Sequence, residues 1–246
     1  MKVLVACEFS GVVRDVFRAK GHDAVSCDLL PSERGLPHYT GNVLDILCRG
    51  NLSSWDMLIA HPPCTYLANS GVTWLYNKDG SRNEQRWQDM KDAAAFFKKL
   101  LYAPIQRIVI ENPIQHKYAR EEIGVSWGQM IHPWQFGHME QKPTCLWLKN
   151  VPALKGTNNV YDVMKKLPAN KRQRIHYMPP SETKQKDRSV TCQWLVFIHP
   201  IFALEPITSR YAHQKIDNHL TQIRNITDTF KPSSYRLIYK NQCLGF

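Results

Sequence analysis

The first 31 residues, MKVLVACEFSGVVRDVFRAKGHDAVSCDLLP, contain the pattern that decides the fold. Val3–Cys7 is a continuous apolar run, as expected for a strand that is buried on both faces. Val12–Lys20 has apolar residues at helical spacing, and Gly21 ends it. A second short apolar segment, Ala24–Cys27, follows and ends at Asp28. A strand, a helix and a strand in this order predict a βαβ unit with two parallel strands.

The same alternation continues as far as residue 113. Trp55–Ala60 is a further apolar run, and Arg107–Ile110 is another. Between them, Glu84–Tyr102 has apolar side chains three and four residues apart and is the clearest helix of the chain. Val43–Leu47 is apolar but short, and Cys145–Leu148 is a weaker strand candidate. The expected fold is therefore α/β, a Rossmann-like and mostly parallel twisted sheet flanked by helices.

Composition limits the possible classes of protein. The 246 residues suffice for one α/β domain, and 43% hydrophobic against 22% charged residues excludes wholesale disorder. The net charge of +11 favours a polyanionic partner, most simply nucleic acid. No apolar run is long enough for a membrane span, and the N-terminus is typical of a strand rather than a signal peptide. The seven cysteines include no C-x-x-C pair, so we expect reduced thiols in a cytoplasm and no metal site.

Unusual residues follow four of the predicted strands, where an open parallel sheet binds its ligands. They are Glu8-Phe9-Ser10-Gly11, Asp28, His61-Pro62-Pro63-Cys64 and Glu111-Asn112-Pro113. Gly11 allows a tight turn between strand and helix, and Asp28 stands where an acid can accept hydrogen bonds from ribose hydroxyls. A full G-x-G-x-x-G is absent, which favours a nucleoside cofactor over a dinucleotide. The alternative is an ordinary turn glycine in a βαβ unit.

The second pair of strand ends contains a candidate nucleophile. Two prolines fix the backbone before Cys64, and a cysteine held in this way can attack an electron-poor ring. A carboxyl group such as Glu111 can supply the proton or hydrogen bond at N3 that addition to C6 of a pyrimidine needs. The alternatives are a small buried cysteine in a turn and a capping acid.

These residues resemble a known family. Phe9-x-Gly11, the acid at 28, Gly41-Asn42-Val43, PPC at 62–64 and ENP at 111–113 follow the order of motifs I, II, III, IV and VI of the DNA cytosine-5 methyltransferases. The longer stretches MLIAHPPCTYLANSG, IENP, PWQFGH, TCLWLK and MPPS resemble short phage- and prophage-type cytosine methyltransferase-like proteins, from residue 1 to about 189. The resemblance implies the class I S-adenosylmethionine-dependent methyltransferase fold, and the host bacterial cytoplasm if the chain is phage-encoded.

The resemblance also implies roles for individual residues. Cys64 would add to C6 of a cytosine in DNA, and Glu111 would bind N3 and the exocyclic amine while S-adenosyl-L-methionine provides the methyl group. In duplex DNA the target base would be flipped out of the stack. The other expected cofactor-binding residues are Glu8, Phe9, Ser10, Gly11, Asp28, Leu29, Asn42, Val43 and Pro62. The expected substrate-binding residues are Asn69, Ser70, Asn112, Arg172 and Arg174.

The chain also departs from the family pattern. Val13 and Arg14 follow Gly11 where glycines are usual, Asn42 replaces an acid, and Thr65 follows the cysteine where glutamine is typical. We expect a catalytic domain over 1–189, with 114–180 as a reduced substrate-recognition region, and a C-terminal extension over 190–246. Two alternatives stay open: methylation of RNA or a free pyrimidine nucleotide, and a catalytically weak nucleic-acid-binding or decoy protein.

Overall fold

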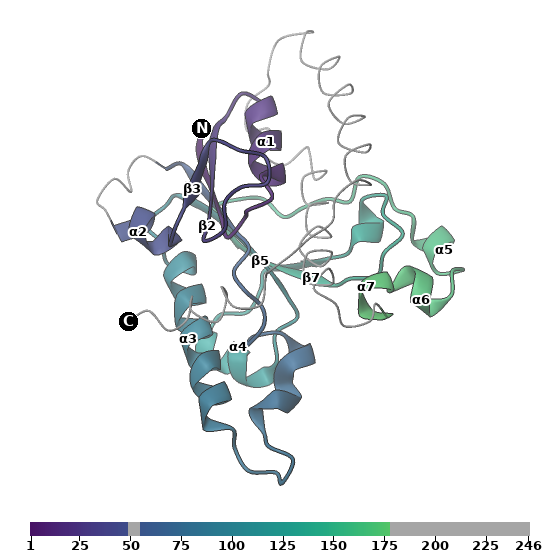
Figure 1. Ribbon diagram of the computed structural model, residues 1–246. Helices are drawn as coiled ribbons and strands as arrows, with labels where there is room; N and C mark the ends of the chain where they lie inside the picture. Colours follow the sequence, from purple (N-terminus) through teal and green to yellow (C-terminus); the bar gives the residue numbers. More distant parts are fainter. Residues whose placement is uncertain (49–54, 178–246) are drawn as a thin grey trace.

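The computed structural model describes residues 1–48 and 55–177, which form an α/β fold around one seven-stranded sheet (Figure 1). The strands are β1 (Lys2–Ala6), β2 (Asp23–Asp28), β3 (His38–Thr40), β4 (Met57–Ala60), β5 (Arg107–Pro113), β6 (Gln129–Ile131) and β7 (Thr144–Lys149). Their order is β3-β2-β1-β4-β5-β7-β6. The strands β1 to β5 are parallel, and β7 runs antiparallel to both β5 and β6. The carboxyl ends of the five parallel strands therefore meet at one edge of the sheet.

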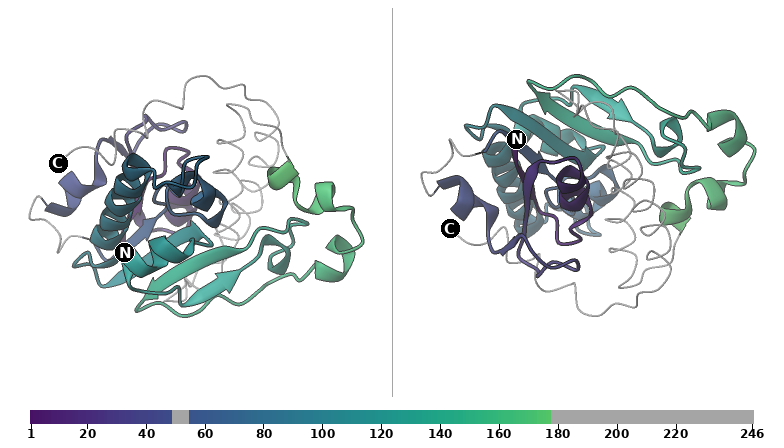
Figure 2. Two further views of the ribbon diagram at one scale, coloured as in Figure 1. Left: turned by 90° about the horizontal axis from the view of Figure 1, so that it is seen from below. Right: turned by 90° about the horizontal axis from the view of Figure 1, so that it is seen from above.

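Helices cover both faces of this sheet (Figures 1 and 2). They are α1 (Val12–Ala19), α2 (Val43–Cys48), α3 (Glu84–Leu101), α4 (Lys117–Ile123), α5 (Tyr161–Met164), α6 (Ala169–Arg172) and α7 (Arg174–Tyr177), with the 3-10 helices η2 (Asn69–Leu75) and η3 (Pro133–Gln135). One buried cluster joins the sheet to α2, α3 and α4, and a second joins its other face to α1. None of the described helices is both long and apolar enough to cross a membrane.

The fold class expected from the sequence is confirmed. The strands that were expected before Asp28, His61 and Glu111 are β2, β4 and β5, and the candidate strand Cys145–Leu148 is β7. The MPPS motif and the expected extension 190–246 lie outside the described residues.

One local expectation needs correction, and one segment left unassigned by the sequence is a helix. β5 does not end at Ile110 but continues to Pro113, because β7 pairs with it beyond the end of β4 and places Glu111 opposite Leu146. The short apolar segment after Asn42 forms helix α2, and the Asn42 side chain begins it by accepting a hydrogen bond from the N–H of Leu44 at 3.0 Å.

Arg14, which follows the turn after β1, forms hydrogen bonds with the segment between β2 and β3. The residue lies in α1, and it is only 1% exposed. Its guanidinium donates to the carbonyls of Gly35 (2.7 Å) and Pro37 (3.2 Å) and to Ser26 Oγ (3.2 Å). Gly11 has a φ of 73°, and a Cβ there would lie 2.6 Å from Nη2 of Arg14. The turn is therefore shaped by a buried cation instead of further glycines.

We expect Arg14→Met to destabilise the protein by about 3 kcal/mol, because it leaves several buried acceptors without a donor. The matched control is Arg18→Met on the same helix, where the side chain is 45% exposed and a change below about 0.5 kcal/mol is expected. The free energies of unfolding come from urea denaturation. Equal stability of the two variants would contradict this function for Arg14.

Candidate active site

The loop after β4 is bonded to the end of β5. Ala60 pairs with Ile110 in the parallel register, so the residues that follow lie side by side. Asn112 Nδ2 donates to the carbonyl of Pro62 at 2.9 Å, and Nδ1 of His61 lies 3.4 Å from Oε2 of Glu111. These two contacts hold the candidate nucleophile loop beside the candidate acid.

Cys64 sits in a closed turn at this edge. Its carbonyl accepts hydrogen bonds from the N–H groups of Leu67 (3.1 Å) and Ala68 (2.8 Å). The chain then pairs with the segment after β5, where the N–H of Asn69 donates to Ile114 at 2.8 Å. Cys64 is partly exposed, whereas Glu111 is 5% exposed. A bonded turn thus carries a partly exposed cysteine, and the neighbouring strand β5 carries a buried carboxyl group.

Several buried polar atoms at this edge have no hydrogen-bond partner among the described residues. They are Glu8 Oε2, His61 Nε2, Asn112 Oδ1 and both side-chain polar atoms of Gln115. Asn112 and Gln115 are each 1% exposed. Nearly all buried polar groups in proteins are paired, so a group of unpaired ones is typical of a binding site. Gln115 was not expected from the sequence, where it lies two residues beyond the recognised motif and has no distinguishing feature.

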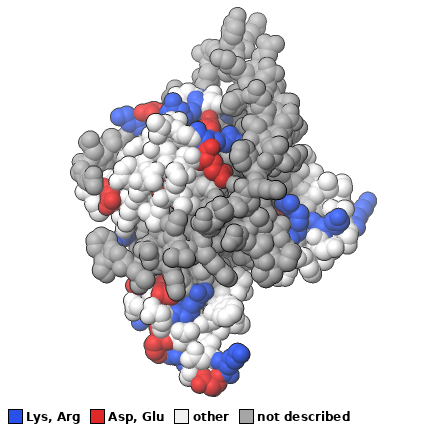
Figure 3. Space-filling view, in the orientation of Figure 1, with Lys and Arg blue, Asp and Glu red and all other residues white. Residues whose placement is uncertain are grey.

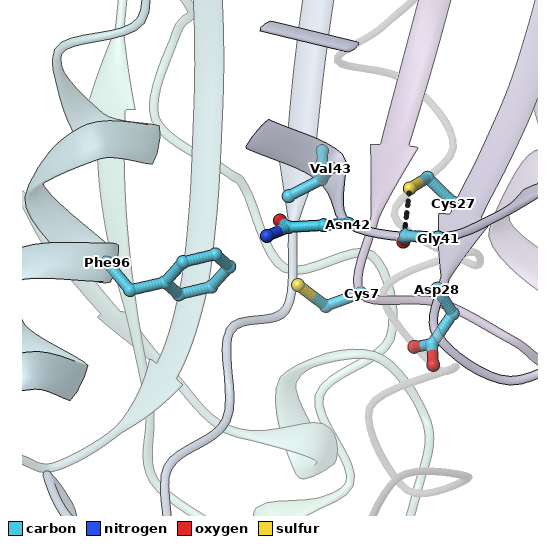
Figure 4. A pocket seen from close by; sticks show the side chains of 7 residues that line it. All are labelled: Cys7, Cys27, Asp28, Gly41, Asn42, Val43 and Phe96. Carbon is cyan, nitrogen blue, oxygen red and sulfur yellow. Dashed lines mark hydrogen bonds between the residues drawn. The ribbon is translucent and has the colours of Figure 1, made fainter. Parts of the chain in front are cut away.

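A pocket lies at the tips of β1 and β2 and the start of α2 (Figure 4). Asp28 is 2% exposed there, and its Oδ1 accepts a hydrogen bond from the N–H of Leu30 at 3.0 Å. Figure 4 shows the Phe96 ring of α3 facing Asn42 and the sulfur of Cys7. The complete lining is Cys7, Cys27, Asp28, Gly41, Asn42, Val43 and Phe96. The structure thus brings together three predicted cofactor residues at 28, 42 and 43, with neighbours that sequence reasoning missed at 7, 27 and 96.

Glu8 and Ser10 accept hydrogen bonds from backbone N–H groups at the N-terminal end of α1. Glu8 Oε1 accepts hydrogen bonds from the N–H of Val13 at 3.0 Å and from the Ser10 hydroxyl at 2.6 Å. Ser10 Oγ in turn accepts from the N–H of Val12 at 3.3 Å. The start of a helix is where βαβ folds usually bind phosphate, because its N–H groups point outward there. Here a carboxyl group of the chain itself takes that position, which suits a ligand without phosphate.

Three cysteines near the sheet edge are neutral thiols. Burial raises the pKa of Cys27 to about 12, with a further contribution from Asp28. Burial and then the charge of Glu111 raise the pKa of Cys145 to about 12. Burial also raises the pKa of Cys7 well above its usual value. Because the thiolate is the nucleophile, these three cysteines are poor candidates for covalent chemistry.

The remaining predicted residues are spread more widely. Leu29 follows β2, Phe9 is 8% exposed in the turn before α1, and Asn69 and Ser70 are exposed at the start of η2. Arg172 donates from Nη1 to the carbonyl of Lys165 at 3.2 Å, within its own segment. Arg174 is exposed on α7.

The segment α5–α7, which contains both predicted arginines, projects beside the β6–β7 end of the sheet (Figures 1 and 2). Figure 3 shows Lys and Arg side chains gathered on it. The substrate-binding function of Arg172 and Arg174 stays a prediction.

The fold and site define a Rossmann-like α/β protein with a small pocket at the tips of β1 and β2, and with a cysteine and a carboxyl group in the segments that follow β4 and end β5. No protein-family model matches the chain, and no curated protein matches it. Among solved structures, a mutant of DNMT2 from Spodoptera frugiperda is similar, with 13% sequence identity, a TM-score of 0.31 and a match covering 61% of this chain. The match covers 50% of that chain, so this chain spans about half the length of that protein. The identity and the TM-score are too low to support a function.

We expect Glu8→Gln to change how stability depends on pH. Burial raises the pKa of Glu8 from its usual value of 4.5, and hydrogen bonds and nearby positive charges only partly oppose this. Folded Glu8 therefore keeps its proton at a pH where the unfolded chain has lost it. Glutamine keeps the acceptor oxygen for Val13 but has no ionisation.

The direction of the change in the free energy of unfolding follows from which state binds the Glu8 proton more tightly. As pH rises above 4.5, the free energy of unfolding of the wild type should fall relative to that of Glu8→Gln, and the difference should level off above the folded pKa. Urea denaturation from pH 4 to 8 measures it. A difference that stays constant over this range would show that burial does not perturb Glu8.

Proposed function

We propose that the protein transfers a methyl group from S-adenosylmethionine to C5 of cytosine, with DNA as the leading substrate. The observation that carries the proposal is the connection of the Cys64 turn to the end of β5 through Asn112 and Pro62 (2.9 Å) and through His61 and Glu111 (3.4 Å). This connection joins a partly exposed thiol and a buried carboxyl group at one edge of the sheet. The motif order described above agrees with it.

In this proposal, the thiolate of Cys64 adds to C6 of the pyrimidine, and Glu111 donates a proton or hydrogen bond to N3. Addition at C6 with N3 neutralised makes C5 nucleophilic. Asn112 holds the loop by donating to the carbonyl of Pro62, which keeps the two reacting groups in a fixed relation. After C5 has taken the donor's methyl group and the donor has left as a neutral thioether, loss of the C5 proton to a base would allow the thiolate to leave.

The chain's own residues fit the methyl donor. When bound, S-adenosylmethionine supplies an electrophilic methyl group. Asp28, at the end of β2, suits the ribose hydroxyls, while Asn42 and Val43 suit the adenine edge. Glu8 already accepts a hydrogen bond from the N–H of Val13 at the start of α1, which favours a nucleoside over NAD or ATP.

Nucleic acid is the substrate class that the charge supports. The net charge of +11 favours a polyanion, and the basic α5–α7 segment is a candidate surface for its phosphates. The target cytosine would leave the base stack to reach Cys64. The region 114–180, which contains this segment, would then serve as the reduced recognition region.

We expect Cys64→Ala to reduce methyl transfer from labelled S-adenosylmethionine to DNA by roughly 10³-fold or more, because the covalent step is lost. Wild-type protein should form a covalent complex with DNA containing 5-fluorocytosine, and the variant should not. The exposed Cys48 provides the control, since Cys48→Ala should retain both properties.

RNA and free pyrimidine nucleotides are assayed as methyl acceptors in the same way as DNA. If the labelled methyl group appears only in RNA, or only in the nucleotides, that molecule and not DNA is the substrate. Absence of label in all three, with salt-sensitive DNA binding that ignores Cys64, would replace the enzyme by a nucleic-acid-binding protein.

We expect Asp28→Asn to weaken binding of S-adenosylhomocysteine at least about tenfold, because a charge-assisted hydrogen bond to the ribose is lost. Asp23→Asn is the control, since Asp23 begins the strand that Asp28 ends and is 63% exposed. Calorimetry measures both, and NADH and ATP should not compete. Unchanged affinity in Asp28→Asn would place the nucleoside elsewhere.

A further inference from the structure

His61 lies on the same face of the sheet as Glu111. Its backbone N–H donates to the carbonyl of Ala6 at 3.0 Å, which continues the β1–β4 ladder one residue beyond β4. Ile59 and Val109 are opposite each other in β4 and β5, and both pack in the cluster beneath α1. Because side chains alternate along a strand, His61 and Glu111 continue these two rows at the open edge of the sheet.

The imidazole and the carboxyl group meet in a sheltered position. Nδ1 of His61 lies 3.4 Å from Oε2 of Glu111, and the two side chains are 13% and 6% exposed. His61 Nε2 is buried and has no hydrogen-bond partner within the described ranges. Catalytic hydrogen bonds are often long before substrate binds and shorten in the reacting complex.

Glu8 is a second carboxyl group near this imidazole. It is 6% exposed, and its Oε2 is buried without a partner in the described part of the chain. Burial raises the pKa of Glu8, while a side-chain hydrogen bond and then the charge of His61 act in the opposite direction. The other groups facing this set are Arg14, which acts on Glu8 from α1, and the neutral thiol of Cys145, which feels the charge of Glu111 from β7.

The His61–Glu111 pair joins two groups that can exchange a proton. Over residues 1–48 and 55–177, no group of three or more His, Cys, Asp and Glu side chains is arranged to hold a metal ion. Two buried carboxyl groups cannot both ionise cheaply without a compensating positive charge. The His61 imidazole lies between the tips of β1 and β5, and an imidazole can both take up and release a proton.

We infer that His61 is a positioning residue that holds the proton used by Glu111, an inference that rests on the proposed pyrimidine chemistry. The His61 imidazolium gives its Nδ1 proton to Glu111, and Glu111 gives a proton to N3 as the Cys64 thiolate forms the bond to C6. Once C5 has bonded to the methyl group and the sulfonium donor has left as a neutral thioether, a base takes the C5 proton, the bond between sulfur and C6 breaks and the thiolate leaves. The N3 proton then returns through Glu111 to His61, so that protons and charge balance over the cycle.

The decisive variant is His61→Asn, whose amide can still donate to Glu111 but cannot release a proton. We expect kcat for methyl transfer to fall roughly 10²-fold, while the affinities for S-adenosylhomocysteine and DNA stay within threefold. The pH profile of kcat should also lose one ionisation. The control is His22→Asn, which makes the same change in the turn before β2, at the opposite edge of the sheet, and should change neither kcat nor the profile.

His61→Asn with wild-type kcat and an unchanged pH profile would overturn the inference and leave the proposed function standing. A loss of kcat with an unchanged profile would also overturn it, because it would show that His61 only supports the structure. Retained cofactor affinity is the check that the variant folds.

A measurement that does not depend on catalysis distinguishes the inference about His61 from the proposed methyl transfer. In ¹⁵N-histidine-labelled protein, NMR should show a ring N–H proton of His61 that exchanges slowly with solvent and changes resonance in Glu111→Gln and in Glu8→Gln. Its absence in wild-type protein would overturn the proton-holding arrangement. If the proton is present but no pyrimidine accepts a methyl group, the arrangement stands and the proposed function fails.

Discussion

The hydrogen bond from Asn112 to the carbonyl of Pro62 is the constraint on which the candidate site depends. Two consecutive prolines lack N–H groups, so the loop after β4 cannot continue the sheet by donating to a neighbouring strand. A side chain from β5 instead supplies the donor that the loop carbonyl needs. That donor is 1% exposed, so water does not compete with it. The position of Cys64 relative to β5 is thus determined by one buried interaction together with the turn that follows.

The extension of β5 past β4 explains why this interaction is possible. A strand that ended with its parallel partner at Ile110 would leave Glu111 and Asn112 in a loop. Pairing with β7 keeps both residues in regular strand geometry, with Glu111 opposite Leu146 and Asn112 opposite Cys145. The acid and the amide therefore point to opposite faces of the sheet, where one reaches His61 and the other reaches Pro62. Pairing with the antiparallel strand β7 therefore fixes the directions in which the Glu111 and Asn112 side chains point.

The sequence predicted what depends on local pattern. Continuous apolar runs identified β1, β2, β4 and β5, and their order implied that Asp28, Cys64 and Glu111 gather at one edge. The extra residues of β5 could not be predicted, because they depend on a strand that lies some thirty residues further along the chain.

Long-range packing explains why the sequence did not predict the positions of Phe96 and Arg14. Phe96 lines the pocket beside Asp28 and Asn42 from α3, a helix whose spacing alone does not show which turn faces the pocket. Arg14 looks like a surface residue in the sequence and becomes buried only because the carbonyls of Gly35 and Pro37 converge on it. In each case the partner is distant along the chain, and no local pattern signals it.

Most of the unpaired buried side-chain atoms of the described residues lie at one edge of the sheet, and the others are Nδ1 of His132 and Nε of Arg172. A stable fold usually pairs its buried polar groups, since each unpaired one costs about 1–3 kcal/mol. Glu8, His61 and Asn112 carry such atoms, and all three belong to strand tips at the carboxyl edge of the sheet. Polar groups that are kept unpaired at the mouth of a parallel sheet are best explained as partners for what binds and reacts at that edge.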